Sequence, residues 1–160
     1  MGFTSFVIIT NSSLTNGSIH MPARKAKATW LGDLKSGNGQ MSFGGRFEQP
    51  FSFSTRFENG VGSNPEELIG GALAGCFSMA LSGGLGKAGF TAKRIQSEAD
   101  VYIEKVGEGF KITKIDLRTD AEIPGIENAK FQEIAEATKK GCPVSQALAA
   151  TPINLIAKLV

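Results

Sequence analysis

The sequence predicts a single α+β domain, and three observations carry that prediction. Two segments in the second half alternate strictly between apolar and polar residues, which is typical of paired strands with one solvated face. Before them, residues 68–85 contain no charged side chain, as in a buried helix. The expected order is three strands, a long helix, two strands, two helices and a final strand, which is an α+β arrangement.

Composition narrows the possible partners. At 160 residues the chain is most simply one domain with a sizeable core. It has 17 basic and 15 acidic side chains, a balance that favours neither nucleic acid nor anionic lipid as a partner. No apolar run approaches the ~20 residues of a membrane helix, so we expect no membrane partner. Two cysteines are too few for a disulfide-stapled secreted scaffold, and we expect a cytoplasmic protein.

Residues 1–22 differ from the rest of the chain. Their short apolar stretch has no basic segment before it, so a signal peptide is not expected. We expect a non-conforming extension or one introduced by cloning, and Met21 is a candidate natural start. A native edge strand is the alternative. The domain itself is expected to cover residues 23–160.

The first three strands are expected at residues 23–31, 40–43 and 51–57, with a turn at 32–39. In the third strand, alternation would put Arg56 on the face opposite three phenylalanines. The long helix should then begin at Ser63 or Asn64, because Pro65 suits the first helical position and acidic residues follow it. Being apolar on all sides, it should be buried on all sides. Its many glycines would be explained by close packing of another backbone.

The second half should begin with a hairpin. Residues 95–103 and 115–123 alternate around a turn at 107–109. An amphipathic helix carrying Phe131 and Thr138 on its apolar face follows, then a short helix from Pro143 and a last strand at 152–160.

The two cysteines offer the clearest chemistry. Cys76 lies within the long helix, and Cys142 opens the short helix, 66 residues later. Without CxxC spacing or a histidine cluster, the pair indicates thiol redox chemistry rather than zinc binding. Burial would raise the pKa of Cys76, so a cation must lower it, and Arg56 is the leading candidate. Glu66 is a nearby acidic partner for that arginine. Taken singly, each of these residues is more often structural than catalytic.

Helix geometry sets a condition on this site. Glu66 and Cys76 are ten residues apart in one helix, hence about 15 Å apart along its axis. If Glu66 orients an Arg56 that contacts Cys76, one of these groups comes from a second subunit. We therefore expect a homodimer with two equivalent shared sites.

Several segments together resemble the osmotically inducible protein C / organic hydroperoxide resistance (OsmC/Ohr) family, and its osmotically inducible branch more closely. They are Thr55-Arg56-Phe57-Glu58, Ser63-Asn64-Pro65-Glu66-Glu67-Leu68-Ile69, Ala74-Gly75-Cys76-Phe77-Ser78-Met79-Ala80-Leu81, Ala88-Gly89-Phe90-Thr91 and Lys139-Lys140-Gly141-Cys142-Pro143-Val144-Ser145. The resemblance implies an OsmC-like fold with antiparallel sheets around a long buried helix, in an intertwined homodimer.

The resemblance also implies a thiol peroxidase acting in oxidative or osmotic stress defence. Cys76 matches the peroxidatic cysteine and Cys142 the resolving cysteine, with Arg56 and Glu66 as the thiolate-binding pair. The cycle would run through a Cys76 sulfenic acid and a Cys76–Cys142 disulfide, which a dithiol reductant reopens. It needs no metal or other cofactor. Phe77 and Met79 near the thiol should favour organic hydroperoxides over hydrogen peroxide.

Two alternatives remain open at this point. One is a non-catalytic binding or structural dimer whose cysteines serve packing. The other is a general thiol-disulfide oxidoreductase acting on proteins, which the absence of CxxC disfavours.

Overall fold

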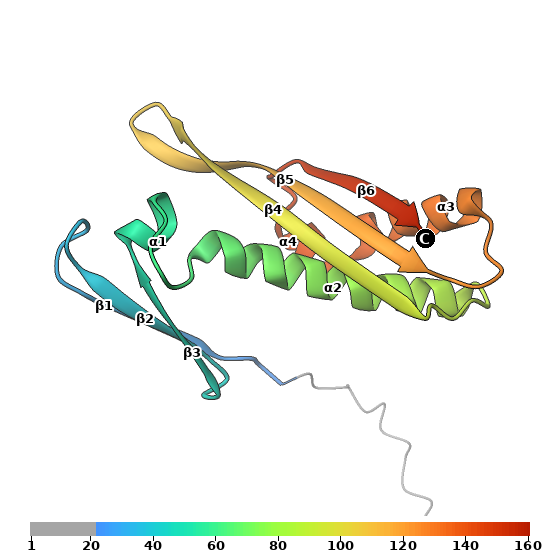
Figure 1. Cartoon of the computed structure of the whole chain (residues 1–160), viewed down its shortest axis with the longest axis horizontal. Helices are drawn as coiled ribbons and strands as arrows, with labels where there is room; N and C mark the ends of the chain where they lie inside the picture. Colours follow the sequence, from blue (N-terminus) through green and yellow to red (C-terminus); the bar gives the residue numbers. More distant parts are fainter. Residues whose placement is uncertain (1–21) are drawn as a thin grey trace, which may run out of the picture.

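A computed structural model describes residues 22–160, and the expectations for residues 1–21 lie outside them. The chain folds into two three-stranded sheets connected by a long helix (Figure 1). The elements are β1 (Ala26–Leu31), β2 (Asn38–Phe43), β3 (Phe47–Ser52), α1 (Phe53–Phe57), α2 (Pro65–Lys87), β4 (Arg94–Val106), β5 (Gly109–Glu122), α3 (Asn128–Gly141), α4 (Pro143–Ala147) and β6 (Ile153–Leu159). The α+β class predicted from the sequence is confirmed.

The first sheet is an antiparallel meander in the order β1-β2-β3. The expected strand at residues 51–57 was wrong, because the strand stops at Ser52 and α1 begins there. A capping box ends the strand: the Ser52 hydroxyl accepts from the Thr55 N–H, and the Ser52 N–H donates to the Thr55 hydroxyl. Arg56 therefore stands in a helical turn.

Helix α2 starts where the capping residues predicted. The Asn64 side chain accepts from the N–H of Glu67 at 2.8 Å, and Pro65 occupies the first turn. The expectation of burial on all sides was wrong for the single chain. Side chains at a three-to-four-residue spacing are buried, whereas Met79 is 79% exposed. We call the exposed stripe the open face of α2; it comprises Gly71, Ala72, Gly75, Met79, Ser82, Gly83 and Gly86.

The glycines of α2 divide between these two faces. A Cβ at Gly70 would lie 2.9 Å from the carbonyl oxygen of Ala99 in β4, so a neighbouring backbone does require glycine there. At Gly71, Gly75, Gly83 and Gly86 a Cβ would meet nothing within 4 Å. Close packing within the chain therefore explains Gly70 but not the glycines of the open face.

The second sheet has the order β4-β5-β6. The predicted β4–β5 hairpin is confirmed, and its turn contains Gly107 at φ +61°. The last strand, β6, pairs with β5 in parallel, and this one pairing departs from the expected antiparallel sheets. The crossover through α3 and α4 makes this pairing possible.

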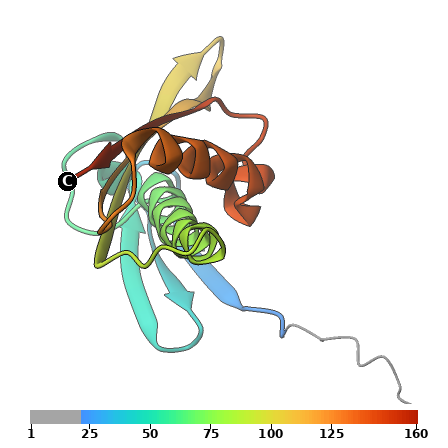
Figure 2. The same ribbon diagram turned by 90° about the vertical axis from the view of Figure 1, so that its right-hand side faces the viewer.

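The core lies between the second sheet and its helices. Figure 2, seen close to the axis of α2, shows α3 running beside it. The first sheet lies beyond the amino-terminal end of α2, away from this core (Figure 1). Fully buried core side chains come from α2, β5, α3 and the residue before α4: Leu73, Phe77, Leu81, Leu85, Ile115, Leu117, Ala121, Phe131, Ala135 and Cys142.

Helix α2 is 23 residues long and apolar enough to meet the length and composition criteria for a membrane span. The sequence-based statement that no segment approaches that length was therefore wrong. Core helices of soluble proteins meet the same criteria, and the buried stripe of α2 packs into the core described above.

Candidate active site

The fold brings the two cysteines together. Cys76 lies midway along α2, and Cys142 occupies the junction where α3 ends and α4 begins. Their sulfur atoms are 3.0 Å apart and share a hydrogen bond, and both thiols are free. Cys142 has no exposed surface, whereas Cys76 is partly exposed. Of the two thiols, Cys76 alone is therefore open to a small molecule from solvent.

The junction that holds Cys142 follows from its sequence. Gly141 closes α3, and Pro143 cannot continue the hydrogen-bond pattern of that helix but suits the first position of a new one. The Cys142 backbone is consequently extended, at φ −63° and ψ 124°, while its N–H still donates to the Thr138 carbonyl at 2.8 Å. This kink points the thiol toward α2.

The two thiols differ in their tendency to ionise. Burial is the main cause that raises the pKa of Cys76, and the hydrogen bond to Cys142 adds to it. Burial acts in the same direction on Cys142, but the hydrogen bond shared with Cys76 and the nearby backbone N–H and hydroxyl of Ser145 lower its pKa overall. In the single chain Cys76 therefore lacks the cation that a reactive thiolate needs.

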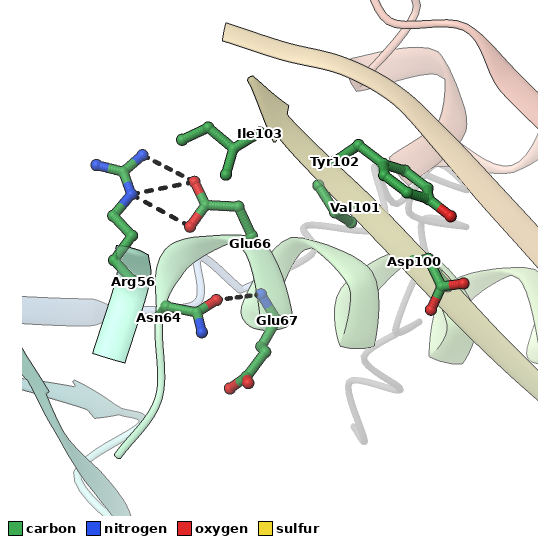
Figure 3. A pocket seen from close by; sticks show the side chains of 9 residues that line it. Arg56, Asn64, Glu66, Glu67, Asp100, Val101, Tyr102 and Ile103 are labelled. Carbon is green, nitrogen blue, oxygen red and sulfur yellow. Dashed lines mark hydrogen bonds and ion pairs between the residues drawn. The ribbon is translucent and has the colours of Figure 1, made fainter. Parts of the chain in front are cut away.

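Arg56 and Glu66 form the second part of the site. Nη2 of Arg56 donates to Oε1 of Glu66 at 2.7 Å, and Nε lies 3.2 Å from both carboxylate oxygens (Figure 3). Glu66 is only 7% exposed, whereas the Arg56 side chain is 39% exposed. The buried carboxylate thus holds the guanidinium in one orientation and leaves part of it accessible.

The chain also fixes the position of α1, which carries Arg56. The Asn64 side chain donates to the Thr55 carbonyl at 3.0 Å, joining α1 to the start of α2. The guanidinium of Arg56 lies 5.3 Å from the centre of the Phe57 ring. Phe57 in turn packs at 4.8 Å between the rings of Phe53 and Phe110, the latter from the β4–β5 hairpin.

Two cavities adjoin the guanidinium. One, of about 440 Å³, lies between the first turn of α2 and strand β4, and Glu66, Tyr102 and Ile103 line it (Figure 3). The other, of about 280 Å³, is mostly aromatic; its lining includes Trp30, Leu34, Phe51, Phe53 and Phe57.

The two parts of the site do not meet within one chain. Ten residues of α2, about 15 Å, separate Glu66 from Cys76. Within residues 22–160, every hydrogen bond and ion pair of the Arg56 side chain goes to Glu66. The structure therefore joins the four predicted residues into two pairs, Cys76 with Cys142 and Arg56 with Glu66.

Sequence reasoning misjudged Phe77, which is fully buried in the core and does not line a pocket beside Cys76. Met79 is exposed on the open face, one turn after Cys76. The apolar cavity is instead built by residues of the first sheet and α1. Ser145 was overlooked, although it belongs to the Cys-Pro-Val-Ser segment: its hydroxyl oxygen is buried without a hydrogen-bond partner. No group of three metal-ligating side chains gathers anywhere in residues 22–160.

Comparison with known proteins agrees with this architecture. Residues 58–156 match the family model described as OsmC-like protein. Peroxiredoxin OsmC of Escherichia coli (strain K12) is 52% identical over 129 residues, which are 79% of this chain and 90% of that protein.

Solved structures share the fold at much lower identity. The OsmC-like protein from Mycoplasma pneumoniae has a TM-score of 0.69 at 15% identity and covers 87% of this chain and 98% of its own. The organic hydroperoxide resistance protein OhrB of Bacillus subtilis has a TM-score of 0.61 at 22% identity and covers 85% and 98%. As the sequence motifs predicted, this chain belongs to the OsmC-like family and to its OsmC branch.

Proposed function

We infer that this protein is a cysteine-based peroxidase that reduces organic hydroperoxides. The observation that carries this inference is the 3.0 Å approach of two sulfurs that are 66 residues apart in the chain. A relative that is 52% identical is named a peroxiredoxin, which supports the same chemistry. The function follows from free thiols held within reach of each other.

Cys76 is the nucleophile in this proposal because it is the thiol that solvent reaches. Its thiolate attacks the terminal oxygen of the hydroperoxide, the O–O bond breaks, and the alkoxide leaves as alcohol after taking a proton. Cys76 is then a sulfenic acid. The Cys142 thiolate attacks that sulfur, hydroxide leaves as water, and a Cys76–Cys142 disulfide forms. A dithiol reductant restores both thiols.

Activation of Cys76 calls for a homodimer. Ala72 and Met79, one turn before and one turn after Cys76 on its exposed side, belong to the open face of α2. A second chain packed on this apolar, glycine-rich face would lie directly beside the thiol. We propose that it brings its own Arg56, oriented by its Glu66, to Cys76. The guanidinium would then lower the pKa of Cys76 and polarise the peroxide.

The aromatic cavity beside Arg56 supports organic hydroperoxides as the preferred substrates. Its volume of about 280 Å³ and its lining by Trp30, Phe51, Phe53 and Phe57 suit a small apolar group. Hydrogen peroxide has no group to place there and should react less well. A cytoplasmic location and a role in stress defence complete the proposal, since two cysteines are too few for a disulfide-stapled secreted scaffold.

Steady-state reduction of cumene hydroperoxide and hydrogen peroxide tests this function, with dithiothreitol as the reductant. The wild-type protein should turn over both and prefer the cumene compound. Cys76→Ser should fall to background, and Cys142→Ser should turn over more slowly and over-oxidise, because dithiothreitol must then reduce the Cys76 sulfenic acid directly. Full activity of Cys76→Ser would refute the assignment. Reduction of insulin disulfides at a comparable rate would instead favour a general oxidoreductase.

A further inference from the structure

We propose that the reductant enters the cycle at Cys76, that Cys142 departs as the thiolate, and that the hydroxyl of Ser145 is the hydrogen-bond donor that receives it. This inference rests on the proposed peroxidase cycle and adds to it the direction of disulfide reduction.

Burial decides which sulfur a reductant can attack. Cys142 has no exposed surface in the single chain and forms part of the core cluster. A partner subunit can only add cover to it. Cys76 is partly exposed on α2 in the single chain, and the proposed cycle requires it to stay open to the hydroperoxide beside the second subunit. Because thiol–disulfide exchange requires access to the attacked sulfur, the reductant must form its mixed disulfide with Cys76.

The surroundings of Cys142 suit a leaving group. Ser145 lies three residues further on, in the first turn of α4, and is 7% exposed. Its hydroxyl oxygen is buried and has no hydrogen-bond partner in the described part of the chain. A buried hydroxyl without a partner is costly, and a thiolate at Cys142 would provide the acceptor. Burial raises the pKa of Cys142, and the nearby Ser145 N–H and hydroxyl are among the groups that bring it below its ordinary value. A thiol with a lower pKa leaves faster.

The step balances without any further reactant. One thiolate of the dithiol attacks the Cys76 sulfur, the bond between the two cysteine sulfurs breaks, and its electron pair goes to Cys142. The second thiol of the reductant gives its proton to the Cys142 thiolate. The resulting second thiolate then attacks the reductant's first sulfur, which is bonded to Cys76. This releases the Cys76 thiolate and the oxidised, cyclic reductant. Two electrons pass from the dithiol to the protein.

Glutathione reports the site of attack at early times, because it has one thiol and a second molecule must collide with the adduct to complete the reduction. Wild-type protein is oxidised with one equivalent of cumene hydroperoxide, exposed to excess glutathione for increasing times, quenched in acid and mapped by mass spectrometry. We expect the adduct on Cys76. An adduct on Cys142, or reduction of the protein with no adduct on Cys76, would overturn the proposal. If no Cys76–Cys142 disulfide forms after oxidation, the proposed function itself fails.

Ser145→Ala tests the donor. Reduction of the oxidised protein by dithiothreitol should slow about tenfold, because the leaving thiolate loses a hydrogen bond. The thiolate absorbance of Cys142, followed against pH in the Cys76→Ser background, should shift to higher pH. Ser145→Thr should restore both. Ser97→Ala, which removes a part-buried hydroxyl between α2 and β5, is the control and should change neither. An unchanged rate and titration in Ser145→Ala would remove Ser145 from this role.

Discussion

The cysteine pair and the arginine–glutamate pair differ in how completely one chain surrounds and contacts them. Cys76 and Cys142 already touch, and the surrounding core covers one of them completely. Arg56 is also firmly oriented, but by Glu66 alone, and cavities adjoin its guanidinium on two sides. Cys76 needs a cation and has none beside it, whereas the guanidinium of Arg56 is held in place away from any thiol of its own chain. The comparison supports a site divided between two subunits, and four experiments test it.

Replacing the arginine should have the largest effect. In our proposal Arg56 stabilises the Cys76 thiolate and the developing charge on the peroxide, so Arg56→Ala should lower kcat/KM for cumene hydroperoxide about 100-fold. Without the guanidinium the pKa of Cys76 stays raised, and the pH–rate profile should shift toward alkaline pH. Arg56→Lys, which keeps the charge but loses the fork toward Glu66, is the matched variant and should be intermediate. An unchanged profile in Arg56→Ala would exclude the role.

Mixing two strongly impaired variants distinguishes a shared site from one formed within a chain. Cys76→Ser and Arg56→Ala chains are unfolded together and refolded in equal amounts. If each site takes its thiol and its guanidinium from different chains, half of the dimers have one intact site, and about a quarter of wild-type activity should return. Each variant refolded alone is the control. No recovery in the mixture would place both groups of a site in one chain.

Sequence patterns predicted the parts of this molecule that depend on local physics. The Asn64 cap and Pro65 predicted the start of α2, and strict alternation predicted the β4–β5 hairpin. The same alternation was misleading at residues 51–57, because the capping box between Ser52 and Thr55 outweighs it. The four site residues were named from spacing and resemblance, and helix length alone separated Glu66 from Cys76.

Features that depend on how distant segments pack together could not be predicted from local sequence patterns. An uncharged helix predicts burial but not by what, so the sequence did not show which side of α2 its own chain leaves open. Ser145 is an ordinary serine in sequence, and only its burial beside Cys142 gives it a candidate role. The aromatic cavity combines Trp30 of β1 with Phe53 and Phe57 of α1, which no local pattern relates.

The contact between Phe57 and the β4–β5 hairpin should make a smaller difference. Phe110 packs on the ring of Phe57, which lies against Arg56. In the row formed by Phe53, Phe57 and Phe110, it is the one ring that comes from outside α1. Phe110→Ala should therefore loosen the arginine and lower kcat/KM about threefold while leaving the glutathione adduct on Cys76. Phe110→Tyr keeps the ring and should retain full activity. If Phe110→Ala matches wild type, the row does not position the guanidinium.

The smallest effect comes from two adjacent glycines on opposite faces of α2. Gly70→Ala should destabilise the protein by about 1–3 kcal/mol, because its Cβ would press on the Ala99 carbonyl. Gly71→Ala meets nothing within its own chain and would gain about 1 kcal/mol of helix propensity if that face were in water. If a second subunit packs closely on that face, Gly71→Ala should instead destabilise the protein. Urea unfolding of both variants at several protein concentrations measures this difference. Stabilisation by Gly71→Ala at every concentration would argue against close packing of a second subunit at that position.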